Sequence, residues 1–176
     1  GKVLVLSIAY GVGPEKIAQS IGCSVTDAKD LLARFEAQFN DISKYKAKVI
    51  RQATGKAPIP YVETIFGRRR YIPELKSQDR GLKSRADRQA FNTVIQGSAA
   101  DLMKLAIVRA HSCFTDEPDV NVVLTIHDEL VTVAREDLAE ETAEAIRVSM
   151  EGIHLPEITV PLIADVKIVN KWGEAK

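Results

Sequence analysis

Three adjacent polar residues, His127, Asp128 and Glu129, interrupt an otherwise largely apolar run from Val122 to Val133. Apolar runs on both sides of a short polar step are typical of two strands joined by a tight turn. Such a turn holds adjacent carboxylates at the end of a sheet, and carboxylates in that position commonly bind Mg²⁺ beside a phosphate. The alternative is an ordinary hairpin turn with solvated charges, and this segment alone does not decide between the two.

A second group of polar side chains recurs every four residues in the segment from about Arg85 to Ser112, which we predict to be a long helix. Arg88, Asn92 and Gln96 would share one face of that helix. A row of guanidinium and amide donors can contact the acceptors that every base pair presents in the minor groove. Small residues beginning at Gly97 would allow close approach of a duplex or of another backbone. An ordinary polar face with a close helix contact is the alternative.

The net charge is zero, but the charges are segregated along the chain. The segment 66–88 has eight Lys and Arg against three Asp and Glu, whereas the segment 114–157 has two against twelve. The basic segment has the sign needed to contact phosphates, and the acidic one has the sign needed to hold cations. Arg68, Arg69 and Arg70 suit contacts with a nucleic-acid backbone, although runs of arginine are often only solvated.

The composition favours a globular protein with a core of its own, since 45% of the 176 residues are apolar. Neither a transmembrane helix nor a signal peptide is visible in the sequence. Cys23 and Cys113 lie far apart and lack the spacing of a metal site. We therefore expect two reduced cysteines in a cytoplasmic, non-secreted protein, with a disulfide as the alternative.

Periodicity and turn residues predict an α+β fold with a helical first half. The expected helices are 15–21, 27–39 with Thr26 as N-cap, about 42–54, about 85–112 and 137–152. The expected strands are 61–65, 120–126, 129–133 and a last strand at 159–169, with a basic loop extending to about Leu82.

Five collinear segments resemble family A DNA polymerases, the DNA polymerase I group. Lys2 to Gly11 is similar to the helix of motif B, and the hairpin residues 127–129 are similar to motif C. Residues 64–69 resemble the family's Thr-x-x-Gly-Arg-Arg segment. Residues 88–101 resemble its Arg-x-x-x-Asn-x-x-x-Gln-Gly-x-Ala-Ala-Asp helix, and Lys171-Trp172-Gly173 resembles its usual ending.

The resemblance implies a fingers portion at 1–81 and a palm portion at 82–176, the latter made of the long helix, the catalytic hairpin, a helix and a strand. It implies template-directed DNA synthesis from deoxynucleoside triphosphates on primer-template DNA with two Mg²⁺ ions. Asp128 would be the main metal ligand and Glu129 an outer one. His127 would contact the primer terminus, unless it is a packed or solvated histidine.

The resemblance also assigns nucleotide-binding roles to Lys2, Leu6 and Tyr10, which are spaced four apart on one helical ridge. Lys2 would neutralise triphosphate charge and donate a proton to the departing pyrophosphate, and Tyr10 would cover the nascent base pair. Leu6 stands where the family usually has Phe or Tyr at the sugar of the incoming nucleotide. Discrimination among sugars is therefore in question at this position.

The second metal-binding carboxylate of the family, the Asp of motif A, lies upstream of motif B and has no counterpart in the chain. The sequence also starts without Met and inside an expected helix. We therefore expect a missing upstream polymerase segment as a partner, in the same parent chain or a separate one, and no membrane partner. Two alternatives are a nucleic-acid-binding module without activity of its own and a metal-dependent hydrolase. The hydrolase would need further His or Asp ligands, and none has suitable spacing.

Overall fold

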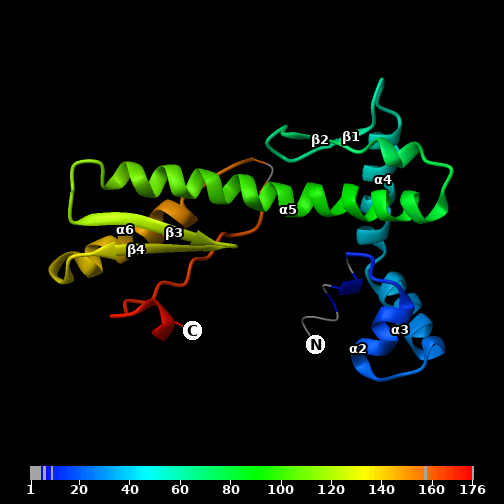
Figure 1. Cartoon of the computed structure of the whole chain (residues 1–176), viewed down its shortest axis with the longest axis horizontal. Helices are drawn as coiled ribbons and strands as arrows, with labels where there is room; N and C mark the ends of the chain where they lie inside the picture. The colour runs from blue at the N-terminus through cyan, green and yellow to red at the C-terminus, as the bar shows by residue number, and fades with distance from the viewer. Residues whose placement is uncertain (1–4, 6, 9, 157, 176) are drawn as a thin grey trace. The chain divides into compact units, whose positions relative to one another are not determined.

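The computed structural model describes residues 5, 7–8, 10–156 and 158–175. The chain divides into two compact units, residues 1–97 and 98–176. The described elements are mostly helical, with two separate two-stranded antiparallel sheets (Figure 1). The predicted α+β class is therefore confirmed. The boundary between the units, at 97/98, lies within the long helix. The division into fingers at 1–81 and palm at 82–176 stays a prediction.

Helix α5, Arg80–Cys113, is the longest element and contributes residues to both units (Figure 1). It has 34 residues, with charged side chains within 80–88 and 101–109 and none at 89–100. Across the described ranges, no helix combines the length and the apolar character required to cross a membrane. The predicted helix at 85–112 is confirmed with a longer N-terminal end.

From Pro14 onward, unit 1 contains three helices followed by a small hairpin. Helix α3 begins at Val25 and is capped by Ser24, not by Thr26, the cap that the sequence predicts. Ser24 Oγ accepts a hydrogen bond from the Asp27 backbone N–H at 3.1 Å, and the Asp27 carboxylate accepts one from the Ser24 N–H. This reciprocal capping box explains the earlier start. The elements are α2 (Pro14–Ile21), α3 (Val25–Gln38), α4 (Asn40–Thr54), β1 (Tyr61–Glu63), β2 (Arg69–Tyr71) and the 3₁₀ helix η1 (Pro73–Lys76).

The basic segment after β1 is not the loop that we predicted up to Leu82. It contains β2, η1 and the first turn of α5, because Ile72 and Leu75 are each only 1% exposed and anchor the segment. They belong to a hydrophobic cluster that joins α4, the β1–β2 hairpin, η1 and α5. The other members of this cluster are Val49, Ala53, Val62, Ala86, Ala90 and Val94. A separate cluster around Ile17 and Ala28 packs α2 against α3.

Unit 2 is built around a second hairpin, β3 (Val120–Ile126) with β4 (Glu129–Ala134). Ile126 pairs with Glu129, so His127 and Asp128 form a two-residue turn. The register shifts between Val122 and Leu124, which is a β-bulge of the kind that increases strand twist. The remaining elements are η2 (Glu136–Leu138), α6 (Ala139–Glu151) and η3 (Trp172–Glu174).

The last strand that we predicted, at 159–169, is wrong for the described structure. A strand requires a ladder of backbone hydrogen bonds to a neighbouring strand. The four strands among the described residues are already paired in the two hairpins. The Ala164 N–H instead donates to the Glu151 carboxylate of α6, and the side chain of Ile163 is 78% exposed. The segment has the apolar alternation of a strand, but among the described residues no neighbouring strand pairs with it.

The capping box predicts the effect of two neighbouring substitutions. Ser24→Ala removes the side-chain acceptor at the start of α3 and should lower the free energy of unfolding by about 1 kcal/mol. Thr26→Ala is the matched control, because Thr26 lies in the exposed first turn of α3 and provides no cap. Urea unfolding followed by the helical signal would measure both. A larger loss for Thr26→Ala than for Ser24→Ala would contradict the assigned helix start.

Candidate functional site

The tip of the β3–β4 hairpin presents His127, Asp128 and Glu129 on exposed positions. Within the described part of the chain, none of the three side chains has a hydrogen-bond or ion-pair partner. His127 has a φ angle of 52°, a left-handed conformation that costs a residue other than glycine about 1–2 kcal/mol. Such strain is concentrated at functional sites. Residue spacing alone had predicted the turn but not this backbone conformation.

The two carboxylates at the tip are a donor set that fits Mg²⁺. This ion is usually bound through one or two carboxylates, with water and substrate phosphates completing its shell. No group of three or more His, Cys, Asp or Glu residues suited to a metal occurs in the ranges that the structure describes. Binding of Mg²⁺ at the tip stays a prediction.

The three ridge residues lie four apart on α5, as the spacing predicts, and two of their side chains have specific partners. Arg88 Nη1 donates to Ser84 Oγ at 2.9 Å, and Gln96 Nε2 donates to the hydroxyl of Tyr10 at 2.6 Å. The side-chain oxygen of Asn92 is buried and accepts no hydrogen bond from the described residues. An unsatisfied acceptor of this kind is an unusual feature in a folded protein.

The segment after Tyr10 lies close to the same ridge. Gly11 has a φ angle of +81°, and a Cβ atom there would lie 2.8 Å from Lys46 Nζ and 3.2 Å from Arg88 Cγ. The structure therefore brings Tyr10, which we had placed only at the nucleotide, together with the long-helix residues. It also adds Lys46, which sequence spacing gave no reason to select. Lys2 and Leu6, the other predicted nucleotide-binding residues, lie outside the described residues.

The three consecutive arginines each contact another part of unit 1. Arg68 Nη2 donates to the backbone carbonyl of Gly97 at 3.1 Å, and Arg70 Nη1 donates to Thr93 Oγ1 at 3.1 Å. Arg69 donates to the Glu63 carboxylate at 3.0 Å. Their predicted contacts with a nucleic-acid backbone stay a prediction.

The Glu63 carboxylate is also held by Lys56, whose Nζ lies 2.7 Å away. These hydrogen bonds, first from Lys56 and then from Arg69, lower the pKa of Glu63 from its ordinary value. The lysine also lies over the Tyr61 ring, at 3.9 Å from its centroid. This part of the hairpin is thus an internal network of charges.

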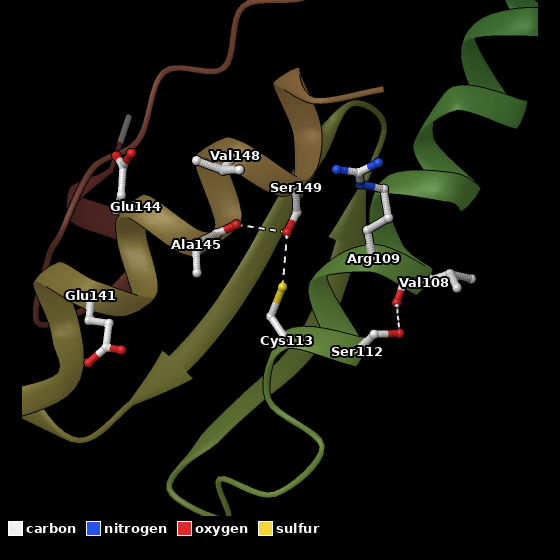
Figure 2. Close-up of a pocket in the computed structure, with 9 residues that line it drawn as sticks. All are labelled: Val108, Arg109, Ser112, Cys113, Glu141, Glu144, Ala145, Val148 and Ser149. Atoms are coloured by element: carbon white, nitrogen blue, oxygen red, sulfur yellow. Dashed lines mark hydrogen bonds between the residues drawn. The ribbon is translucent and has the colours of Figure 1, made fainter. Parts of the chain in front are cut away.

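A cavity of about 630 Å³ lies between α5 and α6, and no residue of the hairpin tip lines it (Figure 2). Its apolar lining includes Val108, Ala145 and Val148, and the Cys113 thiol points toward the Ser149 hydroxyl at 3.5 Å. Both cysteines of the chain are free. None of the predicted site residues lines this cavity, so it is separate from the candidate site.

Comparison with known proteins adds an independent line of evidence. The DNA polymerase family A model matches residues 1–174. DNA polymerase I of Pseudomonas aeruginosa is 34% identical over 99% of this chain, and the thermostable DNA polymerase I of Thermus aquaticus is 33% identical over the same share. DNA polymerase theta of Drosophila melanogaster is also 33% identical. The chain spans 19% and 20% of the two bacterial enzymes and 9% of the fly protein.

A solved structure agrees with this comparison. The POL domain of Pol1 from M. smegmatis, in complex with DNA primer-template and dNTP, matches 92% of this chain with a TM-score of 0.82 and 32% identity. This chain covers 28% of that one. The family resemblance of these segments is confirmed: the chain belongs to DNA polymerase family A.

Proposed function

We propose that the chain is a portion of a DNA-directed DNA polymerase that binds primer-template DNA and supplies Asp128 to the nucleotidyl-transfer site. The observation that carries this proposal is the hairpin tip, where a left-handed His127 presents an exposed Asp128 without a partner among the described residues. The related M. smegmatis domain, which is described in complex with primer-template and dNTP, supports the same class of ligands.

The proposed cofactor is a pair of Mg²⁺ ions. Asp128 would bind directly, Glu129 would act from the outer shell, and a further carboxylate would come from an upstream polymerase segment outside these 176 residues. Bound Mg²⁺ would lower the pKa of the primer 3′ hydroxyl and stabilise charge on the leaving oxygen. Asp128 and Glu129 suit this role because they are adjacent, exposed and anchored by the paired strands on either side.

The proposed duplex-binding surface is the ridge formed by Arg88, Asn92 and Gln96. Ser84 orients the Arg88 guanidinium, and the free acceptor of Asn92 lies one turn further along the helix. His127 would contact the primer terminus. Donors and acceptors fixed on one helix can read the shape of a base pair without reading its sequence. The ridge therefore suits a polymerase, which must accept every correct pair.

The proposed nucleotide side consists of Lys2, Leu6 and Tyr10. In the described structure the Tyr10 hydroxyl accepts a hydrogen bond from Gln96, so a residue proposed to cover the nascent base pair contacts the duplex-binding ridge. This contact would link the two surfaces in the free protein. Lys2 would bind the triphosphate, and Leu6 would pack at the sugar without the hydroxyl that a Tyr would offer.

The exposed apolar side chains of unit 2 support the existence of an upstream partner segment. Val123, Leu124 and Val133 on the hairpin are between 44% and 58% exposed. Val160 and Ile163 in the following C-terminal segment are more exposed still. Contiguous exposed apolar surface is typical of regions that contact another segment or protein. The segment that carries the second carboxylate is the occupant that we propose.

The metal assignment predicts unequal effects of the two acidic substitutions. In the polymerase that contains this chain, Asp128→Ala should slow primer extension about 100-fold or more, because it removes a direct ligand. Glu129→Ala should cost about tenfold or less, as expected for an outer-shell group. Duplex affinity should change little in both. Single-turnover primer extension measures the rates, and Asp116→Ala is the control for loss of an exposed carboxylate. Equal and mild losses of rate for Asp128→Ala and Glu129→Ala would refute the metal assignment.

The strained turn predicts a separation between stability and activity at residue 127. His127→Gly should leave the free energy of unfolding within about 1 kcal/mol of the parent, because relief of the left-handed strain offsets the added chain entropy. Primer extension should nevertheless fall, because the imidazole is lost. His127→Asn, which also tolerates this φ angle, should behave similarly. Full extension by both variants would remove His127 from the site.

A further inference from the structure

The turn between β1 and β2 is fixed by its own hydrogen bonds. The Gly67 N–H donates to the Thr64 carbonyl at 2.9 Å, and the Thr64 N–H donates to the Arg68 carbonyl at 3.0 Å. The Arg68 N–H donates to Thr64 Oγ1 at 3.2 Å. Gly67 has a φ angle of +79°, which favours glycine at this position. The backbone position of Arg68 is thus set before its side chain makes any contact.

This turn contacts α5 at Gly97. A Cβ atom on residue 97 would lie 2.8 Å from the Thr64 methyl carbon, which is closer than real Cβ atoms approach other groups. The Arg68 guanidinium donates to the Gly97 carbonyl at the same place. Thr64 itself is only 5% exposed. Gly97 is therefore explained by close packing of the hairpin turn on the helix.

A second contact lies one helical turn earlier. The Arg70 guanidinium donates to Thr93 Oγ1, and the Thr93 hydroxyl donates in turn to the Gln89 carbonyl at 2.7 Å. Thr93 is 6% exposed, so it can act on a bound duplex only through its neighbours. Thr93 and Gly97 are four residues apart and share one helical face. Each directly follows a residue of the proposed ridge, Asn92 or Gln96.

We infer that the β1–β2 turn is a clamp on α5, in which Arg68 and Arg70 are positioning residues for Asn92 and Gln96. Two contacts spaced one turn apart fix both the rotation and the axial position of this part of the helix. Asn92 and Gln96 each come one residue before a clamped position, and one residue corresponds to about 100° of rotation around a helix. The clamp therefore fixes the direction in which the ridge faces. The inference rests on the proposed duplex-binding function of the ridge. In this inference the two arginines act on a bound duplex by positioning α5, and they do not bind its phosphates.

Loss of a positioning contact and loss of a phosphate contact have different consequences. Removing one phosphate contact reduces the slope of log affinity against log salt by about 0.9 for duplex DNA. Loosening the ridge leaves that slope unchanged, because no counterion is involved. It instead weakens discrimination between correct and distorted pairs at the primer end. Salt dependence and mismatch discrimination together distinguish the two roles.

Thr93→Val is the sharpest test because it removes the acceptor for Arg70 while leaving the arginine and the side-chain shape in place. In the full polymerase, we expect Thr93→Val and Arg70→Gln each to lower the ratio of matched to mismatched primer extension about tenfold, equivalent to one charged hydrogen bond. The double variant should be no worse than either single one. The salt slope should stay at the parent value in all three.

Thr54→Val is the matched control, since Thr54 Oγ1 makes the same type of bond to the carbonyl four residues earlier but contacts no arginine in the described structure. It should leave discrimination unchanged. A reduced salt slope for Arg70→Gln with normal discrimination in Thr93→Val would overturn the clamp and make Arg70 a phosphate ligand. Additive effects in the double variant would overturn it as well.

The Gly97 contact provides a second test with a built-in rescue. Gly97→Ala should lower mismatch discrimination, although alanine favours helix formation by about 1 kcal/mol. Thr64→Ser in the same protein removes the obstructing methyl group but keeps the hydroxyl that binds the Arg68 N–H, so discrimination should return. Failure of this rescue, or normal discrimination in Gly97→Ala, would contradict the clamp. If the parent polymerase itself bound no duplex, the proposed function would fail. The clamp could still be tested by a double-mutant cycle of Arg70 and Thr93 that measures the free energy of unfolding.

Discussion

The contact between the Thr64 methyl group and the backbone of Gly97 is the constraint on which unit 1 depends. No side chain fits between them, so the β1–β2 turn and α5 meet at a fixed distance. The hydrophobic cluster around Ile72 and Leu75 holds the same elements together from the other end of the hairpin. Packing thus fixes a helix whose polar ridge is the proposed duplex-binding surface.

Unit 2 is organised by a different constraint, the two-residue turn between paired strands. The pairing of Ile126 with Glu129 leaves only His127 and Asp128 to reverse the chain, and His127 takes the strained conformation. Strain in a short turn is maintained only when the flanking strands over-determine it. The exposed Asp128 is therefore held by the backbone hydrogen bonds of β3 and β4 rather than by side-chain partners.

Much of this organisation follows from the sequence, and the exceptions share a cause. The hairpin at 120–134, the long helix and the row of Arg88, Asn92 and Gln96 were predictable because they depend on local periodicity. The exceptions depend on features other than periodicity. The capping of α3 by Ser24 depends on local backbone geometry. The hydrogen bonds from Gln96 to Tyr10 and from Arg68 to Gly97 join residues that are distant in sequence. The last strand was mispredicted because apolar alternation indicates a strand but does not supply its partner.

The chain belongs to DNA polymerase family A, and in the proposed function Asp128 is a metal ligand that needs a second carboxylate. The most direct test is primer extension on a defined template with Mg²⁺, by the purified 176-residue chain alone and by the same chain with an upstream family A segment fused or added in trans. The proposed function predicts templated synthesis only when the upstream segment is present. Robust synthesis by the chain alone would contradict it.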